Sequence, residues 1–208
     1  ARGGACRYVL GRDDQSLQIA TTTRFDASQG IARGGGIRGA RLLPHHIPPS
    51  KVRAMFEISR EGPMDDPAIE TLMDAAFGPA HQALPSYFLH DGIDPVAELC
   101  FVAQQRGVIV GTIRYWPLAI PGARSALLLG PIAVDVAHGD LGIGSRLIEH
   151  SLSAARARGH DAVAAIGAAG YLGRFGFHPA LEFALEFLAA VAADRFHALE
   201  LIPNALRG

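Results

Sequence analysis

The residues from Ala126 to Arg158 constrain the fold more than any other part of the chain. An apolar run, ALLLGPIAV, is followed by the polar loop DVAHGD and then by LGIGSRLIEHSLSAARAR, in which apolar residues recur at helical spacing. This pattern predicts a buried strand up to Val134, a glycine-containing turn, and a helix that begins at Leu141. The first amides of such a helix have no intrahelical acceptor, so the junction is suited to binding an anion.

Apolar patterns on both sides of this junction predict a mixed α/β domain with one main sheet. Strands are predicted over residues 56–60, 99–104, 108–116, 126–134, 162–166 and 196–202, with a further strand after Gly176. Helices are predicted over residues 67–77, 141–158 and 171–175. Residues 181–193 fit a helix as well as a strand with a turn. Gly130-Pro131 should put a bulge or a kink in its strand, because proline cannot donate to a sheet ladder.

The chain divides into two parts of opposite charge. Residues 1–50 contain seven Arg and three Asp, which gives +4, and the remainder contains 12 basic and 17 acidic side chains, which gives −5. The first part is glycine-rich and lacks an apolar period. We therefore expect residues 1–52 to be a disordered or non-native extension, Met55 to be the natural start, and residues 53–208 to form the domain. A basic arm for RNA or membrane contact is the functional alternative for the extension.

The cysteines and the apolar segments indicate a cytoplasmic protein. Cys6 and Cys100 have no CxxC or CxxH spacing, and no His, Cys, Asp and Glu cluster has ligand spacing, so we expect free thiols and no metal. No apolar stretch approaches the roughly 18 residues that cross a bilayer, and the start lacks the apolar core of a secretory signal. We expect no membrane contact, and the acidic domain argues against a nucleic-acid partner.

The glycines of the turn match neither of two common phosphate-binding motifs. A dinucleotide motif GxGxxG that starts at Gly142 needs glycine where Leu147 stands. A P-loop whose second glycine is Gly144 needs lysine next, where Ser145 stands. What remains is a GxG sequence, which by itself is more often structural than functional.

Four segments together resemble the GNAT superfamily of N-acetyltransferases, especially its YhbS-like bacterial branch. They are LGPIAVDVAH, LGIGSRLIEH, YLGRFGFHPA and FHALELIPNAL, in the family's order over about residues 56–202. The resemblance implies the GNAT-like acyl-CoA N-acyltransferase fold, with a central, mostly antiparallel sheet and flanking helices, and acetyl-CoA as cosubstrate. It also implies that backbone groups hold the acetyl-pantetheine arm at Ile132, Ala133 and Val134. The implied pyrophosphate site consists of the turn and the helix start, namely Gly139, Gly142, Ile143, Gly144, Ser145 and Arg146.

Two residues of the turn depart from the family pattern. Gly139 stands where the family usually has Gln or Arg, so a side chain that orders the loop is missing. Asp140 stands where Gly is common, and its carboxylate repels a diphosphate unless it points outward or Arg146 offsets it. We expect a functional coenzyme site of reduced affinity.

The resemblance implies that a neutral amine attacks the thioester directly in a ternary complex and expels a CoA thiolate through a tetrahedral intermediate. The family's acid, a tyrosine, belongs at Leu172, and Tyr171 stands one residue earlier, about 100° around a helix. Because this branch often carries two tyrosines here, Tyr171 is our candidate for the acid; the alternative is a packed aromatic. Candidates for the base, each also readable as a surface charge or strand-end group, are Glu57, Glu98, Asp135 and His138.

The acceptor is expected to be a primary amine of a small molecule or a protein. Tyr115 and Trp116 either line its pocket or seal the core. Two other functions stay open: an acyl-CoA-binding module of the same fold with little or no turnover, and transfer to a tRNA-bound or ribosomal amine, which the charge of −5 disfavours. An exposed strand near the C-terminus would allow a homodimer.

Overall fold

The computed structural model describes residues 7–13, 16–22, 56–79, 92–120, 122–187 and 192–206. Its strands are β1 (Arg7–Asp13), β2 (Ser16–Thr22), β3 (Glu57–Arg60), β4 (Phe101–Gln105), β5 (Val108–Ala119), β6 (Ala126–Val134), β7 (Ala162–Ile166), β8 (His178–Pro179), β9 (Leu185–Phe187) and β10 (Phe196–Glu200). Its α-helices are α2 (Asp66–Phe77), α4 (Ile143–Ala157) and α5 (Ala169–Leu172). Its 3-10 helices are η2 (Ala97–Leu99), η3 (Val136–Leu141), η4 (Gly173–Phe175), η5 (Ala180–Phe183) and η6 (Ala193–Arg195). The predicted mixed α/β fold is confirmed.

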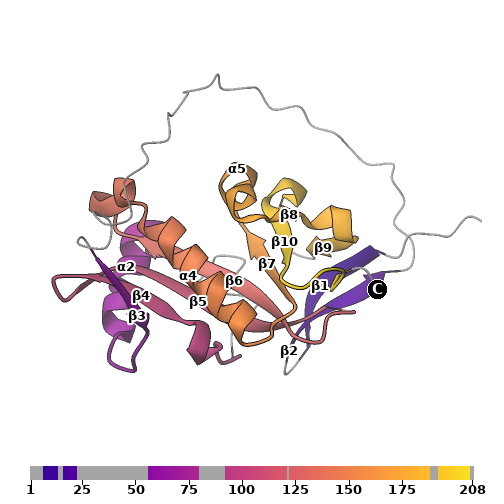
Figure 1. Ribbon diagram of the computed structural model, residues 1–208, viewed down its shortest axis with the longest axis horizontal. Helices are drawn as coiled ribbons and strands as arrows, with labels where there is room; N and C mark the ends of the chain where they lie inside the picture. The colour runs from indigo at the N-terminus through magenta and orange to yellow at the C-terminus, as the bar shows by residue number, and fades with distance from the viewer. Residues whose placement is uncertain are drawn as a thin grey trace, which may run out of the picture.

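The strands of the described ranges belong to one sheet (Figure 1). Its order is β8-β10-β7-β6-β5-β2-β1-β9, and β4, which also pairs with β3, pairs with β5 off this path. β6 runs antiparallel to β5 but parallel to β7. Parallel neighbours need a long crossover, which α4 provides. This connection places the start of α4 just beyond the end of β6.

Of the bulge or kink predicted for β6, the structure contains a bulge. Ile113 of β5 pairs with Ile132, whereas Tyr115 pairs with Leu129, so one residue of β5 faces two residues of β6. A bulge bends its strand and increases the local twist. The change of register lies where β6 leaves β7.

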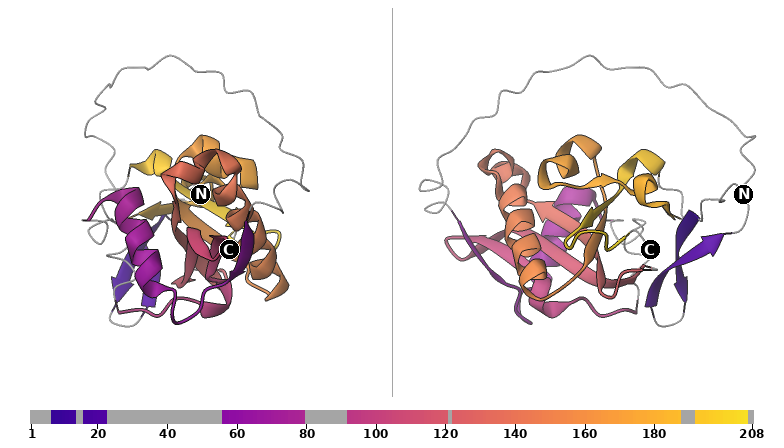
Figure 2. Two further views of the ribbon diagram at one scale, coloured as in Figure 1. Left: turned by 90° about the vertical axis from the view of Figure 1, so that its left-hand side faces the viewer. Right: turned by 45° about the vertical axis from the view of Figure 1, so that its right-hand side comes forward.

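Helices α4 and α2 cover opposite faces of the sheet (Figure 2). The predicted apolar face of α4 is buried, at Ile143, Leu147, Ile148, Leu152 and Ala155. α2 buries Ile69, Leu72 and Met73 in a separate cluster with Val102 and Ala133. Both helices are thus held by burial of an apolar stripe. No helix among the described residues is long and apolar enough to cross a membrane.

The structure adds strands near the start of the sequence and pairs the last strand with two neighbours. Residues 7–13 and 16–22 form the antiparallel pair β1–β2, and β2 continues the sheet beside Leu118 and Ala119, although we expected no regular structure there. β10 pairs with β7 along its length and with β8 at His197 and Ala198, and the homodimer stays a prediction. The ambiguous segment 181–193 contains the end of η5, β9 and the start of η6. Met55 and residues 80–91 lie outside the described residues.

Candidate functional site

The edge of β6 that faces β7 is unpaired after Leu129. β6 pairs with β7 only from Ala126 to Leu129, whereas it stays paired with β5 through Val134. Backbone groups of residues 130–134 that point away from β5 therefore have no strand partner in the described part of the chain. The candidate residues Ile132, Ala133 and Val134 lie in this stretch. An extended ligand can bind such an edge through main-chain hydrogen bonds.

The turn after β6 consists of η3, and α4 begins after Gly142. Gly142 has φ +70° and ψ +19°, a left-handed conformation that glycine adopts without strain. No side chain caps α4. The N–H groups of Ile143, Gly144 and Ser145 therefore have no acceptor within the helix, and the first backbone bond is donated by Arg146 to the Gly142 carbonyl at 3.0 Å. This helix start is suited to an anion.

Tyr171 reaches the same helix start from α5. A Cβ on Gly144 would lie 2.9 Å from the Tyr171 hydroxyl and 3.5 Å from Val134 Cγ2, so glycine is needed for this close approach. Leu172, at the family's usual tyrosine position, is 3% exposed and packs in the core. The one-residue offset thus turns Tyr171 toward the predicted site and Leu172 away from it.

Arg174 is a residue of this region that our sequence interpretation missed. It lies in η4, its Nη2 donates to Ser145 Oγ at 3.4 Å, and its guanidinium stands over the rings of Tyr171 and Phe175. The available signal was its spacing: Arg174 follows Tyr171 by three residues, which brings both to one side of a helical turn.

The turn between β6 and α4 is held by the side chains of Asp135 and His138, and residue 139 contributes no side chain. Asp135 caps η3, and the His138 ring lies 2.9 Å from Gln105 Oε1 and 3.2 Å from the Asp135 carboxylate. Gly139 and Asp140 are exposed, and a Cβ on Gly139 would meet no atom within 4 Å. Two of the base candidates, Asp135 and His138, therefore hold the turn.

The other residues predicted to act as the base or to line the pocket of the acceptor amine do not lie together at the start of α4. Glu57 and Glu98 are exposed, and β4 and β5 separate Glu57 on β3 from β6. Tyr115 and Trp116 are 0% and 4% exposed. The Tyr115 hydroxyl shares a hydrogen bond of 2.9 Å with Ser151 Oγ, and burial raises the pKa of Tyr115. Both aromatic side chains seal the core.

An ion cluster joins the bulge region to α2. Arg114, the β5 residue opposite the bulge, donates from Nε to Glu61 Oε2 at 2.9 Å and from Nη2 to Glu61 Oε1 at 2.6 Å, and it also contacts Asp66. The side chains of Arg114 and Glu61 are only 15% and 14% exposed. In the sequence, the signal for this ion pair was a charged residue, Arg114, inside the otherwise apolar run VIVGTIRYW.

Among the described residues, no group of three or more His, Cys, Asp and Glu could hold a metal ion.

Solved structures of known proteins are similar to the structure of this chain. The structure is similar to that of the GNAT family N-acetyltransferase YhbS from Escherichia coli in complex with CoA, with 25% identity, a TM-score of 0.65, and coverage of 74% of this chain and 86% of that chain. It is also similar to a GNAT family acetyltransferase from Brucella melitensis in complex with acetyl-CoA, with 28% identity, a TM-score of 0.55, and coverage of 71% and 89%. No curated protein matches the sequence.

The profile of the acetyltransferase (GNAT) family matches residues 67–177, more than half of the chain. The match runs from α2 to Phe177 and includes the edge of β6, the start of α4 and Tyr171, the three elements that meet at Gly144. The chain therefore belongs to the GNAT family of acetyltransferases.

Proposed function

We propose that this protein is an acetyl-CoA-dependent N-acetyltransferase whose acceptor is a primary amine of a small molecule or a protein. The observation that carries the proposal is the convergence of Val134, the start of α4 and the Tyr171 hydroxyl at Gly144. Two similar structures hold CoA or acetyl-CoA, which supports the same ligand for this chain.

In this proposal the acetyl-pantetheine arm lies along the free edge of β6. The backbone of Ile132, Ala133 and Val134 supplies hydrogen bonds, because β6 has no neighbour on that side after Leu129 in the described part of the chain. The pyrophosphate binds at the turn and at the unpaired amides of the helix start, at Gly139, Gly142, Ile143, Gly144 and Ser145. The Arg146 guanidinium adds positive charge, although Glu149 lies 3.5 Å from it and neutralises part of that charge.

Tyr171 is the proposed acid for the departing thiolate. Its ring packs edge-on against Phe175, with the ring centroids 5.4 Å apart, so the hydroxyl is held at the helix start. A positioned acid of this kind typically contributes ~10² to 10⁴-fold to the rate. The amine, whose pKa is ~10, must lose a proton before it attacks, and holding the two reactants together supplies much of the remaining acceleration.

A second candidate function is a CoA-binding module with little or no turnover. Gly139 and Asp140 favour it, because the turn lacks an ordering side chain and carries an exposed carboxylate. The position of Tyr171 favours the enzyme instead, since its hydroxyl lies 2.9 Å from where a Cβ on Gly144 would be, and we propose that it takes the role of a tyrosine at residue 172.

Calorimetry and a turnover assay separate these functions. Acetyl-CoA is titrated into the protein, and thiol release from acetyl-CoA is followed with a panel of small amines and amino-terminal peptides, with the product identified by mass spectrometry. The enzyme predicts saturable binding and thiol release that requires an amine. Binding without amine-dependent release supports the module, and no binding of acetyl-CoA contradicts both.

We also propose a cytoplasmic location. Cys100 is a free, buried thiol, as is usual for a protein in a reducing compartment. Fractionation of the native host, with the protein detected by an antibody, tests this location.

A further inference from the structure

Arg174 lies at the start of α4, although it belongs to η4, 29 residues further along the chain than its contact Ser145. Its guanidinium carbon is 5.5 Å from the centre of the Tyr171 ring and 5.7 Å from that of Phe175. Its Nη2 donates to Ser145 Oγ at 3.4 Å. Two aromatic rings and a hydroxyl thus hold the charged end of an exposed side chain in place.

No described residue neutralises this charge. Arg146 pairs with Glu149 and Arg114 pairs with Glu61, but no carboxylate in the described ranges forms an ion pair with Arg174. The start of α4 carries the positive end of the helix dipole, where a further cation is unfavourable by itself. A guanidinium beside unpaired amides becomes favourable once an anion binds to both.

We infer that Arg174 binds a phosphate group of the coenzyme, an inference that rests on the proposed function. The turn supplies no cation at residues 139 and 140, because Gly139 has no side chain and Asp140 adds a carboxylate. Arg174 supplies a cation from the α5–η4 segment instead. A guanidinium can form two parallel hydrogen bonds to a phosphate, so it both neutralises and orients the group.

Three ligands of decreasing phosphate content separate this role from a structural one. CoA carries a diphosphate and a 3′-phosphate, 3′-dephospho-CoA keeps the diphosphate, and acetyl-pantetheine has neither. Calorimetry measures the affinity of the first two, and kcat/KM for thiol release measures acetyl-pantetheine.

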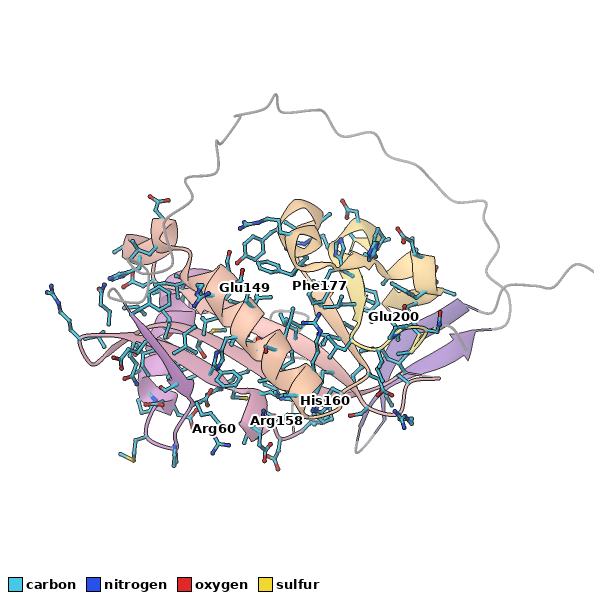
Figure 3. All side chains as sticks on the ribbon, in the orientation of Figure 1. Arg60, Glu149, Arg158, His160, Phe177 and Glu200 are labelled. Carbon is cyan, nitrogen blue, oxygen red and sulfur yellow. The ribbon has the colours of Figure 1, made fainter. Side chains whose placement is uncertain are left out.

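Arg174→Gln is the main variant, because it keeps a polar side chain and removes the guanidinium charge. Arg174→Lys keeps the charge and loses the paired hydrogen bonds. Arg158→Ala is the control: Arg158 lies at the opposite end of α4 (Figure 3), where its Nη1 contacts the Ala154 carbonyl. Thermal melting shows that each variant is folded.

We expect Arg174→Gln to weaken CoA binding by about tenfold or more, as loss of a hydrogen bond between charged groups does. Arg174→Lys should lose less, Arg158→Ala should bind within about twofold of wild type, and acetyl-pantetheine should react alike with all four proteins. An equal loss of affinity for 3′-dephospho-CoA in Arg174→Gln supports contact with the diphosphate. An unchanged affinity for 3′-dephospho-CoA supports contact with the 3′-phosphate.

Unchanged CoA affinity in Arg174→Gln overturns the inference, provided that wild type binds CoA. An equal loss for all three ligands also overturns it, since a disturbed Tyr171 and Phe175 would affect each ligand alike. If Arg174→Gln does not fold, Arg174→Lys alone decides: CoA affinity equal to wild type, with no change in its salt dependence, contradicts a paired phosphate contact. If wild type itself fails to bind CoA, the proposed function fails first.

Discussion

A Cβ on Gly111 of β5 would lie 2.7 Å from the Cγ2 of Ile143, the first residue of α4. It would also lie 3.2 Å from Leu147 Cδ1. Ile143 and Leu147 are buried in the main core, where packing leaves little room to move aside. The start of α4, where the candidate site lies, therefore packs this closely against β5 only because residue 111 has no side chain.

Gly111→Ala should lower the free energy of unfolding by about 1 to 3 kcal/mol, the usual cost of overpacking a core. It should also weaken CoA binding, because relief of the contact moves the start of α4 away from β5. Denaturant unfolding and calorimetry measure the two effects. Gly173→Ala is the matched control, since Gly173 has φ −57° and open space at its Cβ position, and it should be as stable as wild type or slightly more so. Wild-type stability in Gly111→Ala would contradict the close contact.

Tyr171→Phe should reduce kcat by about 10² to 10⁴-fold and leave the affinity for acetyl-CoA within about twofold, because only the acid is removed. Turnover is measured by thiol release at saturating acetyl-CoA. Leu172→Tyr in the Tyr171→Phe background should not restore activity, since Leu172 is buried and its Cδ1 would lie 3.0 Å from a Cβ on Gly167. Full turnover in Tyr171→Phe would remove Tyr171 from the mechanism.

Tyr171 and Leu172 also show where sequence interpretation reaches its limit. The spacing predicts a short helix, and the structure contains one as α5 and η4. Which of two adjacent residues faces the site depends on how that helix packs against Gly144 and the core. The sequence alone therefore allows both interpretations, and the packing of Leu172 decides between them.

The central elements were predictable because their signals are local. The apolar residues of α4 recur at helical spacing, and the bulge follows from Gly130-Pro131. β1 and β2 lie in a glycine-rich segment without a strong period, and β2 is placed by pairing with the distant β5. Arg174 was missed for the same reason, since its contact with Ser145 joins two elements far apart in the sequence.

Asp140→Asn should strengthen CoA binding by about two- to fivefold at low salt. Asp140 is exposed and precedes the start of α4 by three residues, so its charge acts through water and is worth about 0.3 to 1 kcal/mol. Calorimetry at low and high ionic strength measures the gain, which should shrink with added salt. Glu57→Gln, which removes an exposed carboxylate that β4 and β5 separate from β6, is the comparison for a general charge effect. An unchanged affinity in Asp140→Asn would show that the carboxylate does not face the ligand.

Cys100 should make the stability of the protein fall in alkaline solution. It is 2% exposed, its Sγ donates to the Val96 carbonyl at 3.4 Å, and burial raises the pKa of the thiol from its ordinary value of 9.0 to about 11. The folded state therefore favours the protonated thiol, and this contribution is complete below pH 9 and is lost as the pH rises through 11. A pKa raised from 9.0 to about 11 corresponds to a contribution of about 3 kcal/mol at most to the free energy of unfolding below pH 9.

Cys100→Ala isolates this contribution, because alanine does not titrate. In a Cys6→Ser background, the free energies of unfolding with and without the Cys100→Ala substitution are compared by denaturant unfolding from about pH 7 to about pH 11. The cavity left by the smaller side chain lowers stability equally at every pH, whereas the thiol's contribution disappears as the pH rises from 9 to about 11. The difference between the two proteins should therefore shrink over that interval. Two parallel curves would contradict a raised pKa, because a thiol that ionises alike in the folded and unfolded states adds no slope.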